Sequence, residues 1–345
     1  MNRNVSALNP SRILILKFGA LGDVVLITAA LKSIRERYPA AHITCLVGEA
    51  YVSILQDQPV LNAVIPLPQV LVKRWQLGAL FQMAQQLRRE CFDLLIDFQN
   101  NKKSHLLGWL SRIPYRLGYD RKWGVLLNLP VTLPNKKLLP ADHQYAMLAP
   151  LSIKQPEPVF LSLQPSEAQR AMALVLLKNQ SGPFIGINLS ASVRWQTKQW
   201  EVNNLIELLR LFNEAGYQTI LNGTLDDRDK AEAIVKASHV PVINLVGRAN
   251  IPELLGVIAQ CDLFISPDTA PLHMAAALNV PVIGLFGPTD PERYAPPTKN
   301  GVMLSSRPPC APCHSPVCLI GTHSCMQQLT AKQVFNAACQ LGVIQ

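Results

Sequence analysis

Residues 12–38 read RILILKFGALGDVVLITAALKSIRERY, and this stretch decides the fold class. Its first seven residues are short, apolar and rich in Ile and Leu, which is typical of a buried strand. The apolar positions from Val24 to Tyr38 suit a helix that ends before Pro39. A strand joined to a helix by a glycine-containing turn indicates an α/β protein with a parallel sheet.

The same alternation continues along the chain and restarts after a proline-bearing stretch at 153–169. In the first half, strands are predicted at 42–48, 62–68 and 92–99, and a helix at 77–90. In the second half, strands are predicted at 183–190, 217–223, 241–247, 261–267 and 281–287, with helices between them. We therefore expect two doubly wound, Rossmann-like domains, residues 1–160 and 161–345. Ligands should bind beyond the carboxyl ends of the strands, in a cleft that the two domains face.

The composition is that of a globular protein. Of the 345 residues, 49% are hydrophobic and 16% are charged. No apolar run approaches the ~20 residues that a membrane-spanning helix needs, and the first residues lack the apolar centre of a secretory signal. We expect a cytosolic protein whose eight cysteines stay reduced.

Positive charge is concentrated in the first half of the chain. The net charge is +9, and residues 73–137 hold 12 Lys or Arg against 4 Asp or Glu. Such a segment indicates an anionic partner, whether nucleic acid, an acidic membrane surface or an acidic glycolipid. The alternative is a soluble surface that happens to be basic.

Four cysteines lie close together near the end, at Cys310, Cys313, Cys318 and Cys325. The first two have the C-x2-C spacing of zinc ligands, but the later spacings do not repeat the pair usual in structural zinc sites. We therefore favour a loop of free thiols over a metal site.

The turn GALGD (19–23) follows the first strand. It lacks the full G-x-G-x-x-G pattern, so it gives little support to a dinucleotide site. Its glycines allow backbone amides to approach a substrate closely. Asp23 has two interpretations, an N-terminal helix cap or a general base beside the ligand.

The turn SPDTAPLH (266–273) has the same place in the second half, after a strand and before a helix. Amides at the start of that helix form an anion site together with the helix dipole. Thr269 adds a hydroxyl, and His273 lies four residues later on the same face. Helix capping by Asp268 and a structural hydrogen bond from His273 are the alternatives. Lys198, in a loop after another strand, could contact a diphosphate.

Together these segments resemble glycosyltransferase family 9, the ADP-heptose:lipopolysaccharide heptosyltransferases. The signatures of the family stand here as ILILKFGALGDVVLITAALKSIRERYP, KQW and DTAPLHMAAALNVPVIGLFGPTDP. The cysteine-rich end, CAPCHSPVCLIGTHSCM, is similar to that of the heptosyltransferase II branch. The resemblance covers nearly the whole chain and implies a GT-B fold, with an acceptor-binding N-terminal domain and a C-terminal domain that binds the nucleotide-sugar.

The resemblance also implies roles for particular residues. It makes Asp23 the base, and it assigns the donor to Lys198, Asp268, Thr269, Ala270, His273 and Asp226. Ala270 stands where the family has glycine, and a backbone amide contact survives this change if the residue keeps a negative φ.

The activity implied is an inverting transfer of a heptose from ADP-heptose to the acidic core of lipopolysaccharide. No metal or other cofactor is expected, since a lysine and a helix N-terminus can stabilise the leaving ADP. Acceptor binding is assigned to Lys102, Lys103, Arg121 and Lys122 on a protein that associates peripherally with the inner membrane. No nucleic acid partner is expected. The rival hypothesis is a basic nucleotide- or nucleic-acid-binding protein, whose interleaved tryptophans would stack on bases.

Overall fold

The computed structural model describes residues 7–133, 138–192 and 194–344, and for Lys73 the backbone alone. Lys136 and Lys137, at the C-terminal end of the basic segment 73–137, lie outside the described residues. Contacts within the chain divide it into two domains, Met1–Val159 and Phe160–Gln345. This boundary lies one residue before the one expected from the sequence.

The N-terminal domain is built on a six-stranded parallel sheet with the order β3-β2-β1-β4-β5-β6. Its strands are β1 (Arg12–Lys17), β2 (His42–Gly48), β3 (Ala63–Leu67), β4 (Leu94–Asp97), β5 (Tyr115–Tyr119) and β6 (Leu129–Val131). This is the strand order of dinucleotide-binding folds, in which the topology reverses between β1 and β4. The carboxyl ends of these two strands are therefore where a ligand is expected.

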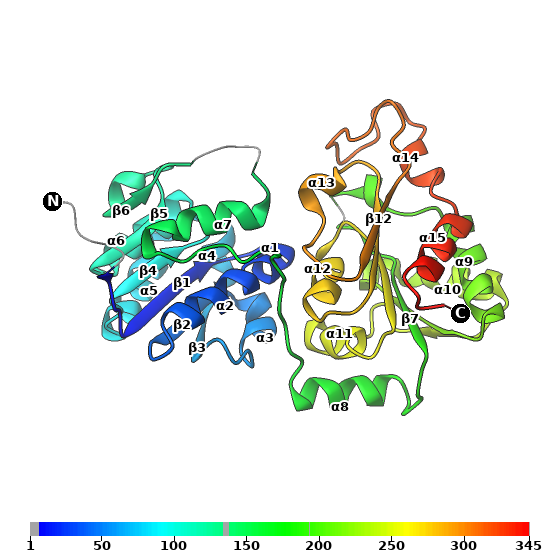
Figure 1. Ribbon diagram of the computed structural model, residues 1–345, viewed down its shortest axis with the longest axis horizontal. Coiled ribbons are helices and arrows are strands. Elements are labelled where there is room, and N and C mark those ends of the chain that lie inside the picture. Colours follow the sequence, from blue (N-terminus) through cyan, green and yellow to red (C-terminus); the bar gives the residue numbers. More distant parts are fainter. Residues whose placement is uncertain (1–6, 134–137, 193, 345) are drawn as a thin grey trace. The chain divides into compact units, whose positions relative to one another are not determined.

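Helices cover both faces of this sheet (Figure 1). On one face α2 packs against α1 and α7, and on the other α5 packs against α6. The helices are α1 (Leu21–Leu26), α2 (Thr28–Arg37), α3 (Val52–Leu55), α4 (Gln69–Lys73), α5 (Leu77–Arg89), α6 (Lys102–Leu110) and α7 (Pro140–Leu148). The helix predicted from Val24 to Tyr38 is thus divided at Ile27 into α1 and α2.

The C-terminal domain repeats this plan with the order β12-β11-β10-β7-β8-β9, again all parallel. Its strands are β7 (Phe184–Asn188), β8 (Gln218–Asn222), β9 (Val242–Asn244), β10 (Leu263–Pro267), β11 (Val282–Phe286) and β12 (Gly301–Ser305). Counted from β7, the order is the same as in the first domain. The topology therefore reverses between β7 and β10.

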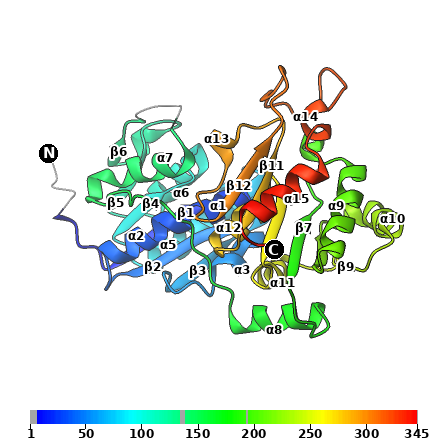
Figure 2. The same cartoon turned by 45° about the vertical axis from the view of Figure 1, so that its right-hand side comes forward.

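In this domain α9 packs with α10 and α15, and α11 packs with α8 and α12 (Figures 1 and 2). The helices are α8 (Glu167–Leu176), α9 (Val202–Glu214), α10 (Arg228–Ser238), α11 (Ile251–Ile258), α12 (Ala270–Ala277), α13 (Pro291–Tyr294), α14 (Ser324–Gln327) and α15 (Ala331–Gln340). The predicted parallel α/β architecture of both halves is confirmed.

Burial explains why the strands read as continuous apolar runs. Ile13 to Leu16 in β1 are fully buried, as are Ile265 and its neighbours in β10. Strands covered by helices on both faces have no solvent side, so they show no polar alternation. Among the described residues, no helix combines the length and the apolar character needed to cross a membrane.

Candidate active site

In the N-terminal domain, the loops that follow β1 and β4 meet at the reversal point of the sheet. The backbone N–H of Phe18 donates to Oε1 of Gln99 at 2.9 Å. This bond ties residues 18–23, which include GALGD, to the loop after β4. Gln99 was not predicted as a site residue, although a polar residue just beyond a buried strand is a usable signal.

Asp23 is not the cap of its helix. It is the third residue of α1, whose N-cap is Ala20, and the cap position makes no side-chain hydrogen bond. The carboxylate instead forms an ion pair with Lys17, whose Nζ lies 3.3 Å from Oδ2. More than half of the Asp23 side chain (54%) remains exposed. A carboxylate held by one oxygen and open to solvent is able to accept a proton from a bound hydroxyl.

The backbone and the packing around Gly19 require a glycine. Its φ of +151° suits glycine, and an added Cβ would lie 2.6 Å from the ring of Tyr51. Gly48 is equally constrained, because its Cβ would lie 2.4 Å from the carbonyl oxygen of Phe18. The tight packing of the β1 loop against the end of β2 therefore requires both glycines.

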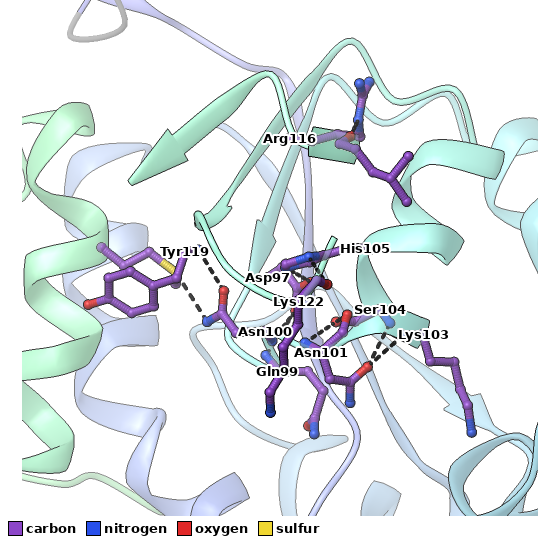
Figure 3. Close-up of polar contacts among 12 residues, drawn as sticks. Asp97, Gln99, Asn100, Asn101, Lys103, Ser104, His105, Arg116, Tyr119 and Lys122 are labelled. Atoms are coloured by element: carbon purple, nitrogen blue, oxygen red, sulfur yellow. Dashed lines mark hydrogen bonds and ion pairs between the residues drawn. The ribbon is translucent and has the colours of Figure 1, made fainter. Parts of the chain in front are cut away.

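A buried carboxylate organises the loop after β4 (Figure 3). Oδ1 of Asp97 accepts the backbone N–H groups of Gln99 and Asn100, each at 2.9 Å. Its Oδ2 lies 3.4 Å from Nε2 of His105, and both side chains are fully buried. Burial raises the pKa of Asp97, although His105 and the hydrogen bonds oppose this shift. Nδ1 of His105 lies 3.2 Å from the carbonyl oxygen of Lys122, which connects the cluster to the loop after β5.

Lys103 does not offer its charge to a ligand as the acceptor assignment supposed. The residue is buried, and its ammonium donates to backbone carbonyls at the end of α4, those of Leu71, Val72 (3.2 Å) and Arg74 (2.9 Å). Burial lowers its pKa. These three acceptors match the three N–H groups of a lysine, so the side chain caps the C-terminus of α4.

The other three basic residues of the acceptor assignment are exposed. Lys102 begins α6, and its Nζ lies 5.6 Å from the ring centroid of Trp123. Arg121 and Lys122 lie in the loop between β5 and β6. These three cations are placed where a soluble anion could reach them.

In the C-terminal domain, the loops after β7 and β10 are joined by an ion pair. Nζ of Lys198 donates to Oδ2 of Asp268 at 2.7 Å and to its backbone carbonyl at 2.9 Å. The ammonium also lies 4.8 Å from the ring centroid of Trp195. A lysine has three N–H groups, and two of them are used in the bonds to Asp268. These two bonds hold Lys198 at the reversal point and leave one of its three N–H groups outside the contact with Asp268.

The Thr269 hydroxyl points into the protein. Thr269 is the N-cap of α12 but makes no side-chain cap hydrogen bond. Nδ2 of Asn188, at the end of β7, donates to Oγ1 of Thr269 and to Oγ of Ser266, each at 3.1 Å. Asn188 and Ser266 are buried and were not selected from the sequence. Because the Thr269 side chain makes no cap hydrogen bond, the first amides of α12 can face an anion.

The remaining donor residues occupy different environments. Ala270 is the first residue of α12. It is not one of the described residues with a positive φ, so it keeps the negative φ that an amide contact needs. His273 is buried on the same helix. Asp226 is exposed, whereas the adjacent Asp227 is buried and accepts hydrogen bonds from Ser190 and Thr224.

The cysteine-rich loop braces the Lys198 loop. Thr197 donates through Oγ1 to the carbonyl oxygen of Ser315 at 2.8 Å, and Nε2 of His323 lies 2.7 Å from the carbonyl oxygen of Thr197. The backbone N–H of His314 donates to Pro288, in the loop after β11. The loop that carries Cys310, Cys313 and Cys318 thus has a structural role beside the candidate donor site.

All eight cysteines are described, and no disulfide joins any of them. Within the described chain, no three His, Cys, Asp or Glu side chains converge as a metal site would require. The thiol of Cys318 accepts the backbone N–H of His323 at 3.4 Å. This hydrogen bond, opposed by a little desolvation and helped by other backbone N–H groups, lowers the pKa of Cys318.

Comparison with known proteins identifies the family that the chain matches. The family model described as glycosyltransferase family 9 (heptosyltransferase) matches residues 80–323, well over half of the chain. Lipopolysaccharide heptosyltransferase 2 of Escherichia coli (strain K12) is 25% identical over 302 residues, which cover 84% of this chain and 86% of that protein.

Two solved structures show the same fold. The glycosyltransferase family 9 protein from Veillonella parvula DSM 2008 has a TM-score of 0.83 and 21% identity, and the match covers 98% of this chain and 99% of that one. The E. coli ADP-heptose lps heptosyltransferase II has a TM-score of 0.78 and 22% identity, with coverage of 96% and 98%. The two Rossmann-like domains of this chain therefore belong to the GT-B class.

Proposed function

Because the chain belongs to glycosyltransferase family 9, the heptosyltransferases, we propose that it transfers a heptose from ADP-heptose to the inner core of lipopolysaccharide. The observation that carries the proposal is the Lys198–Asp268 pair beside the uncapped start of α12. Both lie at the reversal point of a nucleotide-binding type of sheet, where an anionic ligand is expected. The names of two relatives specify lipopolysaccharide, and one of them ADP-heptose, for those proteins.

The reaction we propose is a direct displacement. An acceptor oxygen forms a bond to the anomeric carbon of the heptose while the bond from that carbon to the β-phosphate oxygen breaks. The hydroxyl proton goes to the carboxylate of Asp23, and ADP leaves with the bonding electron pair. Attack opposite to the leaving group inverts the anomeric centre.

Charge on the leaving ADP is the main electrostatic demand of this step. Lys198 supplies a positive charge, and the amides at the start of α12 supply oriented dipoles. Asp268 keeps the ammonium in position before the donor binds. We propose that these groups suffice without a metal ion, so that full activity should persist in excess chelator. Activity lost to chelator and restored by a divalent cation would refute this part.

The acceptor side is proposed to use the exposed cations Lys102, Arg121 and Lys122. Phosphate and carboxylate groups of the lipopolysaccharide core carry the complementary charge. Because this acceptor is a membrane glycolipid, we place the protein at the inner face of the membrane as a peripheral protein. The nucleic-acid alternative accounts for the basic segment but for neither the family match nor the two marked loops of the C-terminal domain.

The test is a transfer assay on the purified full chain. It uses ADP-heptose and a panel of truncated core acceptors, with ADP release and acceptor mass as readouts. We expect ADP release that depends on an acceptor and a product one heptosyl unit heavier. Tight binding to heparin or to single-stranded DNA, without transfer to any acceptor of the panel, would favour the alternative.

A further inference from the structure

We propose that one surface of the N-terminal domain docks onto an anionic lipid bilayer. This surface consists of Trp75, Leu77, Phe81, Trp123 and Val125, and we call it the Trp75–Trp123 patch. The proposal rests on the proposed function in one respect, since a glycolipid acceptor is what makes a membrane the relevant surface. It names the side chains that would enter the lipid headgroup region.

Large apolar side chains are unusually exposed in this patch. Trp75 is 50% exposed, Leu77 70%, Phe81 46%, Trp123 45% and Val125 88%. Among the described residues, the exposed tryptophans are Trp75, Trp109 and Trp123. Tryptophan has an apolar ring with a polar N–H group, and it favours boundaries between apolar and aqueous phases.

The patch residues come from neighbouring elements. The rings of Trp75 and Trp123 have centroids 6.0 Å apart, although the two residues are 48 positions apart in the chain. Leu77 and Phe81 are four residues apart on α5, so they lie on the same face of that helix. Helix α6 packs against α5 and against the short 3-10 helix Gly124–Leu126 that carries Val125.

The apolar stripe of α5 extends beyond the core of the domain at the N-terminal end of the helix. Leu80, Ala84 and Leu87 are almost fully buried in the core of the domain. Leu77 lies three residues before Leu80 and seven before Ala84, so it continues this stripe, but it is 70% exposed, and Phe81 one turn later is 46% exposed. A contiguous exposed apolar patch with a polar surround is typical of an interaction site.

The charges around the patch suit an anionic partner. Four exposed cations lie near the two tryptophans. Arg74 precedes Trp75, Arg121 and Lys122 precede Trp123, and Nζ of Lys102 lies 5.6 Å from the centroid of the Trp123 ring. Of the four acids in the basic segment only Asp120 is classed as exposed, and the four exposed cations near the tryptophans outnumber it. Exposed aromatic and aliphatic side chains flanked by cations are the combination that binds anionic membranes peripherally.

Other occupants fit less well. A sugar ring can stack on tryptophan, but it gains little from Leu77 or Val125, which are the two most exposed residues of the patch. A second copy of the chain would bring the same cations against each other, and like charges disfavour such a pairing. The apolar and charged parts together therefore indicate a lipid surface.

The experiment is vesicle co-sedimentation with the full chain, using phosphatidylcholine vesicles with and without about one-third phosphatidylglycerol. The test variant is Leu77→Gln with Phe81→Gln. The control is Val175→Gln with Met172→Gln on α8, because these side chains have matching exposures of 73% and 44%. Melting temperatures establish that both variants fold.

We expect the parent to bind the anionic vesicles, to bind less in high salt, and to bind neutral vesicles weakly. The test variant should lose at least ~10-fold in affinity, since two partly inserted apolar side chains are removed. The control should bind as the parent does.

Equal binding by parent and test variant, or an equal loss in the control, overturns the proposal. A parent dimer that the test variant dissociates assigns the patch to self-association and likewise overturns it. Binding of a lipid-free core oligosaccharide by the parent, lost in the variant and without vesicle binding, assigns the patch to sugar and overturns it too.

Failure of the proposed function would look different. With a lipid-free core acceptor, the test variant should keep the transfer rate of the parent. Absence of transfer by the parent, with vesicle binding intact, would contradict the proposed function and leave the docking surface standing.

Discussion

Asp23 is the residue on which the proposed bond-forming step depends. Replacing it with Asn keeps the shape of the side chain but removes its basicity, so transfer should fall ~10²–10⁴-fold. ADP-heptose binding should stay within a few-fold of the parent, as calorimetry would measure. Asp229→Asn is the control, because Asp229 is also an exposed acid in the first turn of a helix. Full activity in the Asp23 variant would show that Asp23 is not the base and only forms the ion pair with Lys17.

Lys198 should act on the donor both before and during the reaction. Lys198→Ala removes a charged hydrogen bond, which is worth about 1.5–3 kcal/mol, so the Kd for ADP should rise and turnover should slow. Lys299→Ala is a matched control, since its Nζ lies 4.8 Å from an aromatic ring as that of Lys198 does. If both variants bind ADP with the affinity of the parent, Lys198 lies outside the donor site.

At this scale the sequence indicated the marked residues but not their local partners. Asp268 and Lys198 could be selected because each follows a predicted strand. Their ion pair joins residues 70 positions apart, and a single sequence contains no signal for it. Asn188 and Ser266 were missed for the same reason. Lys103 was assigned from its charge, and its burial against the end of α4 depends on tertiary packing.

The cysteine-rich loop is the element whose role the structure redefines. It contacts the Lys198 loop through the Thr197 hydroxyl. Thr197→Val should therefore raise the Kd for ADP a few-fold, because the Ser315 carbonyl loses its donor and the loop that carries Lys198 shifts. Thr28→Val is the control, since Thr28 is also buried and donates to a backbone carbonyl. If both variants bind ADP as the parent does, the loop does not position Lys198.

Most elements were predictable because their strands are long apolar runs. Three edge or near-edge strands were missed, β5, β6 and β12. Each is short or interrupted: Gly118 lies in β5, Pro130 in β6 and Gly301 at the start of β12. Helix α6 was missed because Lys102 and Lys103 were interpreted as surface charge. Its start is specified by the capping box of Asn101 and Ser104, which is a local signal that the sequence does contain.

At the scale of the whole molecule, the exposed cations of the N-terminal domain should affect the kinetics of the acceptor and not those of the donor. Neutralising Lys102, Arg121 and Lys122 to Gln should raise the KM for a lipid-free core acceptor and flatten its dependence on salt. The KM for ADP-heptose should not change, because the donor residues belong to the other domain. Steady-state kinetics at low and high salt measure both constants. A change in the donor constant alone would mean that these cations do not bind the acceptor.

The central claim is that this chain moves a heptose from ADP-heptose to a lipopolysaccharide core. The most direct measurement is mass spectrometry of a defined core acceptor incubated with ADP-heptose and the purified parent, with ADP quantified in the same reaction. The account predicts one added heptosyl unit for each ADP released, and neither product with the Asp23→Asn variant on the same timescale. ADP release without any change in acceptor mass, or an unchanged donor with every core acceptor tested, would contradict it.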